Sequence, residues 1–248
     1  MKNKPSLQAK SIETNQFEPH QDLIDRLQRH QRHHFKRPFA DHTRLAFDSL
    51  IAWLEGWHGD VVLDTCCGVG ESSIAIAREY PDVMVVGIDK SNQRLAKHSS
   101  YSSINKAQLS TYPVNAIPKN YMLLQADLND FWRLLNHYIE QQSPAWKVIK
   151  QYILYPNPYP KKTQLGKRWH ASAIFPEILK TCQCIEVRSN WKIYLEEFKI
   201  AAEYFGLIGE LNNIEASQAP ITPFERKYLA SGQTCFKLDI RPAGSDKE

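Results

Sequence analysis

The feature that most constrains the fold is a pair of apolar runs on either side of a glycine-rich turn. Residues 61–64 (VVLD) lead into the turn at residues 66–70 (CCGVG), and residues 72–80 then have the composition of a helix. A second apolar run follows at residues 83–89 (VMVVGID). Short runs that are apolar throughout are typical of parallel strands buried on both faces. The order of strand, turn, helix and strand therefore predicts a βαβ unit.

The same alternation continues through the rest of the chain. Further strands are predicted at residues 122–125, 151–155, 184–187, 207–211 and 234–240, and further helices at residues 45–54, 128–138, 175–180 and 191–205. Residues 99–120 are polar and rich in turn-forming residues, so we expect an insertion or loop there. Strands that alternate with helices predict an α/β fold around a mostly parallel sheet.

Acidic residues stand at the ends of three successive predicted strands, at Asp64, Asp89 and Asp127. Because parallel strands end at one edge of a sheet, we expect the three carboxylates to line one crevice. An acid after the first strand suits a ligand with a cationic group, such as the amino acid end of S-adenosylmethionine. Asp89 is placed to accept hydrogen bonds from ribose hydroxyls, and Asp127 is placed near the adenine.

The glycine turn argues against a dinucleotide as the ligand. Dinucleotide-binding turns have the pattern G-x-G-x-x-G, and here Ser73 takes the position of the third glycine after Gly68 and Gly70. The two glycines still allow a ligand to lie against the backbone. The turn and the three acids together predict S-adenosylmethionine as the cofactor.

Positive charge is concentrated in two stretches, although the formal net charge of the chain is only +4. The stretch Arg26–Arg44 holds basic residues and histidines against the single acid Asp41, and the stretch Lys161–Arg168 holds Lys161, Lys162, Lys167 and Arg168 with no acid. Such stretches predict contacts with RNA phosphates, and an ordinary solvated face is the alternative. The spacing His30-x-x-His33-His34 leaves a metal site open as a minor alternative, but we predict none.

The second basic stretch directly follows residues 155–160 (YPNPYP). The three prolines of this segment restrict its backbone, so Asn157 and Tyr159 are held in place after the predicted strand. The ring of Tyr159 can stack on a nucleobase, and the lysines that follow can contact the flanking phosphates.

The five cysteines (Cys66, Cys67, Cys182, Cys184 and Cys235) lie in apolar segments, and we interpret them as reduced core residues. Neither close pair has the ligand spacing of a zinc site. The chain has no apolar run near the length of a membrane span, and its first residues do not resemble a signal peptide. We therefore expect a soluble, cytoplasmic protein without a membrane partner.

Six stretches resemble class I S-adenosylmethionine-dependent methyltransferases and, within them, the tRNA (guanine-N7-)-methyltransferase family. VLDTCCGVGES, VVGIDKS and LLQAD are similar to the cofactor motifs of the superfamily. YPNPYPKK, Ser189-Asn190-Trp191 and Thr222-Pro223-Phe224-Glu225 are similar to three motifs of the family itself, in the same order. The resemblance covers roughly residues 60–240.

The resemblance implies a Rossmann-like class I methyltransferase fold with a mostly parallel seven-stranded sheet and helices on both faces. We expect the methyltransferase domain at residues 43–241, a basic and partly flexible arm at residues 1–42, and a tail at residues 242–248. The implied cofactor is S-adenosyl-L-methionine. The implied partner is tRNA, bound through Arg26–Arg44 and Lys161–Arg168 and methylated at N7 of a guanine. The oligomeric state is left as monomer or homodimer.

The resemblance also assigns site residues position by position. The implied cofactor-binding residues are Asp64, Cys66, Gly68, Gly70, Asp89, Lys90, Asp127, Leu128 and Asn157. The implied catalytic residues are Asn157 and Tyr159. The implied substrate-binding residues are Lys161, Asn190, Thr222, Phe224 and Glu225.

Three positions depart from the family pattern. Asn157 and Asn190 stand where the family has aspartates, and Tyr159 stands where it has a tryptophan. Two alternatives therefore stay open. Asn157-Pro158-Tyr159 resembles the Asn-Pro-Pro-aromatic motif of exocyclic-amine methyltransferases, of the N6-adenine or glutamine type. The second alternative is that the chain is a catalytically silent RNA-binding paralogue.

Overall fold

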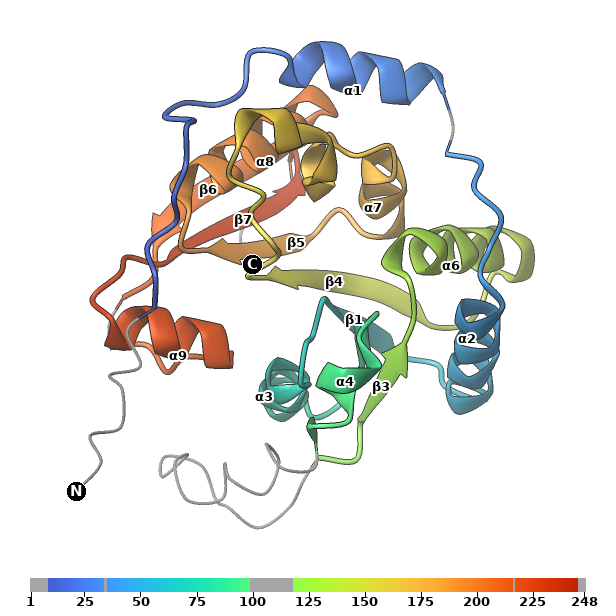
Figure 1. Cartoon of the computed structure of the whole chain (residues 1–248). Helices are drawn as coiled ribbons and strands as arrows, with labels where there is room; N and C mark the ends of the chain where they lie inside the picture. The colour runs from blue at the N-terminus through green and yellow to red at the C-terminus, as the bar shows by residue number, and fades with distance from the viewer. Residues whose placement is uncertain (1–8, 34, 99–117, 216, 245–248) are drawn as a thin grey trace, which may run out of the picture. The chain divides into compact units, whose positions relative to one another are not determined.

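The structure is a computed structural model that describes residues 9–33, 35–98, 118–215 and 217–244 (Figure 1). Its residue contacts form two compact units. The first unit consists of residues 1–34, 155–175 and 186–248, and the second consists of residues 35–154 and 176–185. The loop predicted at residues 99–120 lies outside the described residues except for its last three, and so does His34.

Seven strands form one sheet in the order β3-β2-β1-β4-β5-β7-β6 (Figure 1). Their bounds are β1 Asp60–Thr65, β2 Met84–Asp89, β3 Tyr121–Gln125, β4 Lys147–Leu154, β5 Ile185–Ser189, β6 Leu207–Asn213 and β7 Phe236–Pro242. Each coincides with a predicted strand to within a few residues. Only β6 and β7 pair antiparallel among the pairs whose registers are described, so the predicted α/β fold with a mostly parallel seven-stranded sheet is confirmed.

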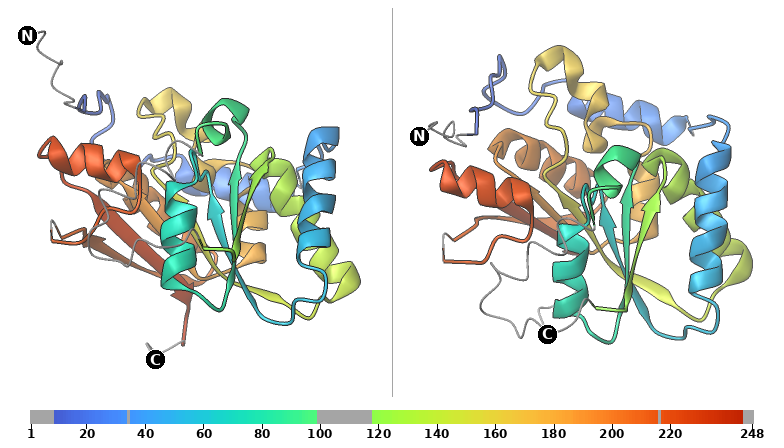
Figure 2. Two further views of the ribbon diagram at one scale, coloured as in Figure 1. Left: turned by 90° about the horizontal axis from the view of Figure 1, so that it is seen from below. Right: turned by 60° about the horizontal axis from the view of Figure 1, so that its bottom comes forward.

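The second unit is built on the parallel strands β1 to β4. Val61 to Thr65 of β1 pair with Met84 to Ile88 of β2, and β3 continues the sheet from Val85↔Tyr121 to Asp89↔Gln125. The helices of this unit are α2 (Asp41–Trp53), α3 (Glu71–Glu79), α4 (Asn92–Leu95), α6 (Leu128–Gln142) and most of α7 (Phe175–Thr181). Helix α3 covers one face of these strands, and α2 and α6 cover the other (Figure 2).

The core of the second unit explains why its strands are apolar on both faces. Val62, Val85 and Val86 have no exposed surface because helices cover the sheet on each side. On the α6 side, Phe131 and Trp132 are also fully buried, and Phe47 of α2 meets the ring of Phe131 edge-on at 6.1 Å. This packing fixes the register of the strands that carry the predicted acids.

The first unit contains the β6–β7 hairpin, the greater part of β5, and helix α8 (Lys192–Tyr204). The apolar stripe of α8 is buried as its spacing predicted, with Tyr194, Leu195 and Phe198 at 0% exposure. Two 3₁₀ turns, η1 (Lys162–Lys167) and η2 (Trp169–Ala171), follow the proline-rich segment.

Two helices of the first unit were not predicted, α1 (Leu23–Arg32) and α9 (Pro223–Ala230). Helix α1 lies within the predicted basic arm, and its buried residues Leu23 and Leu27 are four positions apart. Helix α9 begins with Thr222 as its N-cap, and the Thr222 hydroxyl accepts a hydrogen bond from the amide of Glu225 at 3.0 Å. The pattern Thr-Pro-x-Glu is a recognised helix-start signal, so α9 could have been predicted.

In the part of the chain that the structure describes, no helix combines the length and the apolar composition that a membrane crossing requires. The boundaries predicted at residues 42 and 241 stay predictions.

Candidate functional site

Asp64, near the end of β1, is fully buried, and only one of its two carboxylate oxygens has a hydrogen-bond partner among the described residues. Its Oδ2 accepts hydrogen bonds from the hydroxyls of Ser72 and Ser73, each at 2.6 Å. Its Oδ1 is buried and has no hydrogen-bond partner among the described residues. Burial raises the pKa of Asp64 to about 6, although the two serine hydrogen bonds act to lower it. A buried carboxylate oxygen without a donor is a fitting acceptor for a cationic group.

The turn after β1 holds three residues in the left-handed backbone region. Cys66 has φ 66°, Gly68 has φ 62° and Gly70 has φ 75°. A Cβ atom on Gly70 would lie 2.5 Å from Cδ1 of Leu123 and 2.7 Å from Nδ1 of His98, so another residue there would have to displace these side chains. A Cβ on Gly68 would meet nothing within 4 Å, so the need for glycine there comes from its backbone angle. A strained turn of this kind at a strand end is a common feature of functional sites.

Asp89, at the end of β2, holds the glycine turn in place. Its Oδ2 accepts from the backbone amide of Gly68 at 3.0 Å, and its Oδ1 accepts from the amide of Ser91 at 2.7 Å. Arg94 of α4 reaches the same Oδ2 at 3.4 Å. A carboxylate has about four acceptor positions, so these three donors leave room for one further hydroxyl. Asp89 therefore has a structural role in holding the turn, and its role toward ribose stays a prediction.

Asp127 caps helix α6 and pairs with an arginine of the predicted basic arm. Its Oδ1 accepts from the amide and the side chain of Asn129, each at 2.9 Å, and its Oδ2 lies 3.1 Å from Nη2 of Arg37. Burial alone would raise the pKa of Asp127, but the Asn129 and Arg37 interactions lower it. Arg37 also donates to the fully buried Asp130 at 2.9 Å. Arg37 is thus bound by two carboxylates and is not a free cation.

The predicted cofactor residues of the second unit therefore meet at one edge of its sheet. Asp64 and Asp89 lie in the last residues of β1 and β2. Cys66 follows β1, Lys90 follows β2, and Asp127 and Leu128 follow β3. Hydrogen bonds to Asp89 connect the segments at this edge. The amide of Gly68 donates to the Asp89 carboxylate, and the amide of Ala126, next to Asp127, donates to the Asp89 carbonyl at 3.2 Å. The Oδ1 of Asp64, which has no donor among the described residues, and the left-handed turn at Gly68 and Gly70 fit the amino acid end of S-adenosylmethionine.

A surface hollow of about 540 Å³ in the second unit lies elsewhere. It is lined by residues of α2 and α6 and by Trp57 and Trp146, next to the amino ends of β1 and β4. None of the predicted site residues lines it. The chemistry of the strand ends, and not the depth of this hollow, indicates where a ligand binds.

The proline-rich segment of the first unit is strained on both sides of Asn157. Tyr155 has φ 49° and Tyr159 has φ 45°, and neither is glycine. Asn157 is exposed, and its Oδ1 lies 3.4 Å from the amide of Tyr159. Tyr159 is half-buried, and Nζ of Lys167 lies 5.7 Å from its ring centroid. The segment presents an amide, an aromatic ring and a cation together.

Arg168 does not belong to the exposed basic cluster predicted for tRNA, and the prediction is wrong for this residue. Its side chain has no exposed surface and forms a buried ion pair with Glu197 of α8 at 2.5 Å. The guanidinium also packs over the ring of Trp191 at 4.8 Å. A guanidinium without exposed surface cannot contact a phosphate, so the arginine has a structural role. Lys161, Lys162 and Lys167 are exposed, as predicted.

The remaining predicted substrate residues lie around helix α9 and the end of β5. Asn190 donates to Oε1 of Gln233 at 2.9 Å. Phe224 is 46% exposed and lies against Tyr228, while Glu225 is fully buried and accepts from Arg188 and from the hydroxyl of Tyr155. Thr222 is the helix cap already described. The contacts of these predicted residues with a substrate stay predictions. Within this unit, the buried carboxylate of Glu225 has a structural role.

Residues that sequence reasoning missed lie mainly around Glu197. Its carboxylate accepts from Gln16, from the amide of His20, and from Arg168 and His170. Burial alone would raise the pKa of Glu197, but His170 and Arg168 lower it to about 2. The sequence carries one signal for this, because Glu197 lies three residues after Tyr194 on the buried stripe of α8. A charged residue on such a stripe requires a buried partner.

No group of three or more histidine, cysteine or acidic side chains is arranged for a metal ion within the described ranges. The described cysteines form no disulfide with one another, and burial raises the pKa of the Cys67 thiol. Reactive thiolates are typically exposed or beside a cation, so Cys67 is a packing residue.

Comparison with known proteins gives a family match over most of the chain. Residues 58–238 match the family model described as "Putative methyltransferase". A tRNA (guanine-N(7)-)-methyltransferase of Mycolicibacterium gilvum (strain PYR-GCK) is 30% identical over 190 residues, which are 72% of this chain. The alignment spans 66% of that relative's own length.

A solved structure with a similar fold is that of the 16S rRNA methyltransferase KamB. It has a TM-score of 0.51 and 17% sequence identity, and the match covers 83% of this chain and 95% of that one. At this identity the match shows the fold alone, and the fold is that of the α/β sheet described above.

Proposed function

The chain belongs to the methyltransferase family whose model matches residues 58–238, as its sequence motifs predicted, and we propose that it methylates N7 of a guanine in tRNA with S-adenosyl-L-methionine as the methyl donor. The relative from Mycolicibacterium gilvum carries this activity in its name. The proposal also rests on the segment after β4, where an exposed asparagine, a tyrosine ring and exposed lysines follow one another on a strained backbone.

The residues proposed to hold the cofactor are those at the strand ends of the second unit. Oδ1 of Asp64 is the proposed acceptor for the amino group, because it is a buried carboxylate oxygen at the end of β1 without a hydrogen-bond donor among the described residues. Asp89 offers its remaining acceptor position to a ribose hydroxyl, and Ala126 to Leu128 lie on the adenine side. When bound, the cofactor supplies a methyl group on a positively charged sulfur.

The residues proposed to hold the nucleotide belong to the first unit. Guanine N7 has a lone pair in the plane of the ring and no proton to lose, so the reaction requires no general base. This chain then contributes alignment and electrostatic stabilisation. Asn157 can accept from a base N–H group or donate to O6, Tyr159 can stack on the base, and Lys161 can contact a phosphate.

The asparagine at position 157 reduces one part of this catalysis without removing it. Methylation at N7 leaves a positive charge on the purine, and an aspartate would stabilise that charge more than an amide does. An amide still orients the base by hydrogen bonds. We therefore propose that Asn157 aligns the base and that alignment is its main contribution. Cytoplasmic location and a tRNA contact through the exposed lysines are part of the same proposal.

The product identifies the reaction. Purified protein is incubated with tRNA and labelled cofactor, and the RNA is then treated with alkali and aniline, which cleave the chain at 7-methylguanosine. We expect label in the tRNA and cleavage at a guanosine, and we expect neither with Asp64→Ala. The control is Asp60→Asn, because Asp60 is at the start of β1 and pairs only with exposed Lys147 among the described residues.

The other outcomes have definite meanings. Label in tRNA without cleavage would refute the N7 assignment and favour an exocyclic-amine methyltransferase. RNA binding without any transfer of label would favour a silent paralogue.

A further inference from the structure

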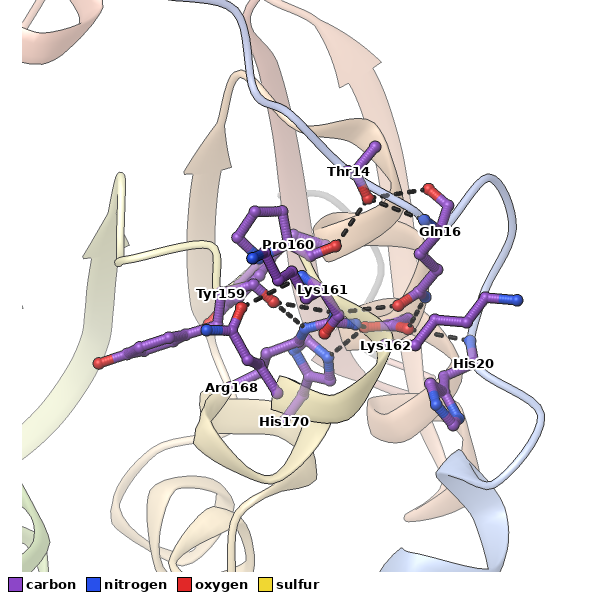
Figure 3. A network of polar contacts seen from close by, with 12 residues as sticks. Thr14, Gln16, His20, Tyr159, Pro160, Lys161, Lys162, Arg168 and His170 are labelled. Carbon is purple, nitrogen blue, oxygen red and sulfur yellow. Dashed lines mark hydrogen bonds and ion pairs between the residues drawn. The ribbon is translucent and has the colours of Figure 1, made fainter.

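Part of the N-terminal segment is bonded to the loop that follows β4 (Figure 3). The hydroxyl of Thr14 donates to the carbonyl of Pro160 at 2.6 Å. The side chain of Asn15 accepts from the amide of Lys162 at 3.0 Å. Direct hydrogen bonds within the first unit therefore connect the N-terminal segment to the residues on either side of Lys161, which is a predicted substrate residue.

Gln16 is the buried member of this segment, with 1% of its surface exposed. Its Nε2 donates to Oε1 of Glu197 at 2.6 Å and to the carbonyl of Glu18 at 2.8 Å. Its Oε1 accepts from Nη2 of Arg168 at 2.9 Å. The single amide thus bridges both members of the buried ion pair. Neighbouring Glu13 and Phe17 are exposed, so burial is specific to Gln16 in this stretch.

Arg168 connects this bridge to residues 155–164, the segment from the end of β4 into η1, which we call the substrate loop. Its Nε donates to the carbonyl of Tyr159 at 3.1 Å, and its Nη2 donates to the same carbonyl at 3.0 Å and to that of Lys161 at 3.3 Å (Figure 3). Tyr159 has a left-handed backbone, a conformation that is strained for a residue other than glycine. Such a conformation persists only where the surrounding contacts hold it.

We propose that Gln16 is a positioning residue for the substrate loop: it fixes Arg168 against Glu197, and Arg168 in turn holds the backbone of Tyr159 and Lys161. The inference rests on the proposed function, because the loop is the proposed nucleotide site. Without the Gln16 amide, Arg168 loses one acceptor and Glu197 loses one donor in a site that water does not reach. The N-terminal segment also loses its buried contact with the loop.

The test compares Gln16→Ala with Asn136→Ala. Asn136 is a matched control because it is also a buried amide, bonded to Glu177 and Thr181 of the second unit, whereas the loop belongs to the first unit. Hydrogen exchange measured by mass spectrometry should become at least about fivefold faster in the peptide covering residues 157–164 in Gln16→Ala and should not change there in Asn136→Ala. Unchanged exchange in Gln16→Ala would overturn the proposal.

A second readout separates positioning from general destabilisation. For Gln16→Ala, kcat/KM for tRNA should fall by about tenfold or more, while the Kd for S-adenosylmethionine stays within about twofold of wild type. An equal loss in Asn136→Ala would mean that stability alone accounts for the effect, and the proposal would be wrong. If Gln16→Ala does not fold, Thr14→Val removes the bond to Pro160 and must give the same two changes in smaller degree.

The two proposals fail in different ways. If wild-type protein methylates no RNA, the proposed function fails, and the exchange experiment alone then decides whether Gln16 holds the loop. If wild type methylates tRNA and Gln16→Ala is as active as Asn136→Ala, the proposed function stands and the positioning role is refuted.

Discussion

Arg168 and Glu197 form an ion pair in which neither side chain has any exposed surface. Arg168 is the last residue of the basic stretch Lys161–Arg168, and this ion pair gives it a structural role in the first unit. Removing one member of a buried pair leaves an uncompensated charge, which typically costs about 3 to 5 kcal/mol.

We therefore expect Arg168→Met to lower the free energy of unfolding by about 3 to 5 kcal/mol, as measured by urea denaturation. Lys161→Met is the control, because Lys161 is exposed seven residues earlier; it should change stability by less than about 0.5 kcal/mol. The double variant Arg168→Met with Glu197→Gln should lose less than the sum of the two single changes. A near-neutral Arg168→Met would contradict the burial of this arginine.

RNA affinity should depend on the lysines that the structure leaves exposed. Lys161→Glu combined with Lys162→Glu should weaken tRNA binding and reduce the slope of log K against log salt by about 1 to 2, because each lost phosphate contact removes roughly 0.7 to 0.9 from that slope. Filter binding at several salt concentrations measures this. Lys180→Glu with Lys192→Glu changes the net charge equally at residues that pair with Glu140 and Glu196. The same slope in both double variants would mean that net charge, and not this cluster, binds the RNA.

Cofactor affinity should depend on pH through Asp64. Its pKa in the free protein is raised from 3.8 to about 6, so the carboxyl is protonated below that pH and ionised above it. A cationic ligand binds the ionised form, so affinity should rise as pH increases through about 6, and binding should release a proton. Calorimetry between pH 5 and about 7.5 checks this.

Asp64→Asn should bind more weakly and lose the pH dependence, while Asp60→Asn keeps both. A pH-dependent affinity that survives in Asp64→Asn would assign the titration to another group.

The role of Asn157 is tested by restoring or removing its polar group. Asn157→Asp should keep or raise the rate of N7 methylation, since a carboxylate stabilises the developing positive charge. Asn157→Ala should lower the rate by about ten- to a thousandfold, the range for one positioned polar group. Single-turnover kinetics with tRNA measure the rate. Thr163→Ala, at an exposed position in the same loop, is the control. An Asn157→Ala variant with wild-type rates would exclude this residue from the site.

The sequence by itself determined the sheet and the acids at its edge. Local patterns fix these features, because a buried parallel strand is apolar throughout and the residue after it lies at the carboxyl edge wherever the strand packs. Asp64, Asp89 and Asp127 could therefore be placed from their positions in the chain. The same argument explains why the exposed lysines after the proline-rich segment were found, since they follow a strand directly.

Only the tertiary structure decided which charged side chains are available to contact RNA. The sequence predicts both Arg37 and Arg168 as exposed cations. Arg37 is exposed but pairs with Asp127 and Asp130, whereas Arg168 is fully buried against Glu197. Gln16 lies 152 residues from Arg168 along the chain, and no local pattern connects them. A charge can be buried only where a partner from a distant segment compensates for its lost hydration, so its fate depends on long-range packing that the surrounding sequence does not contain.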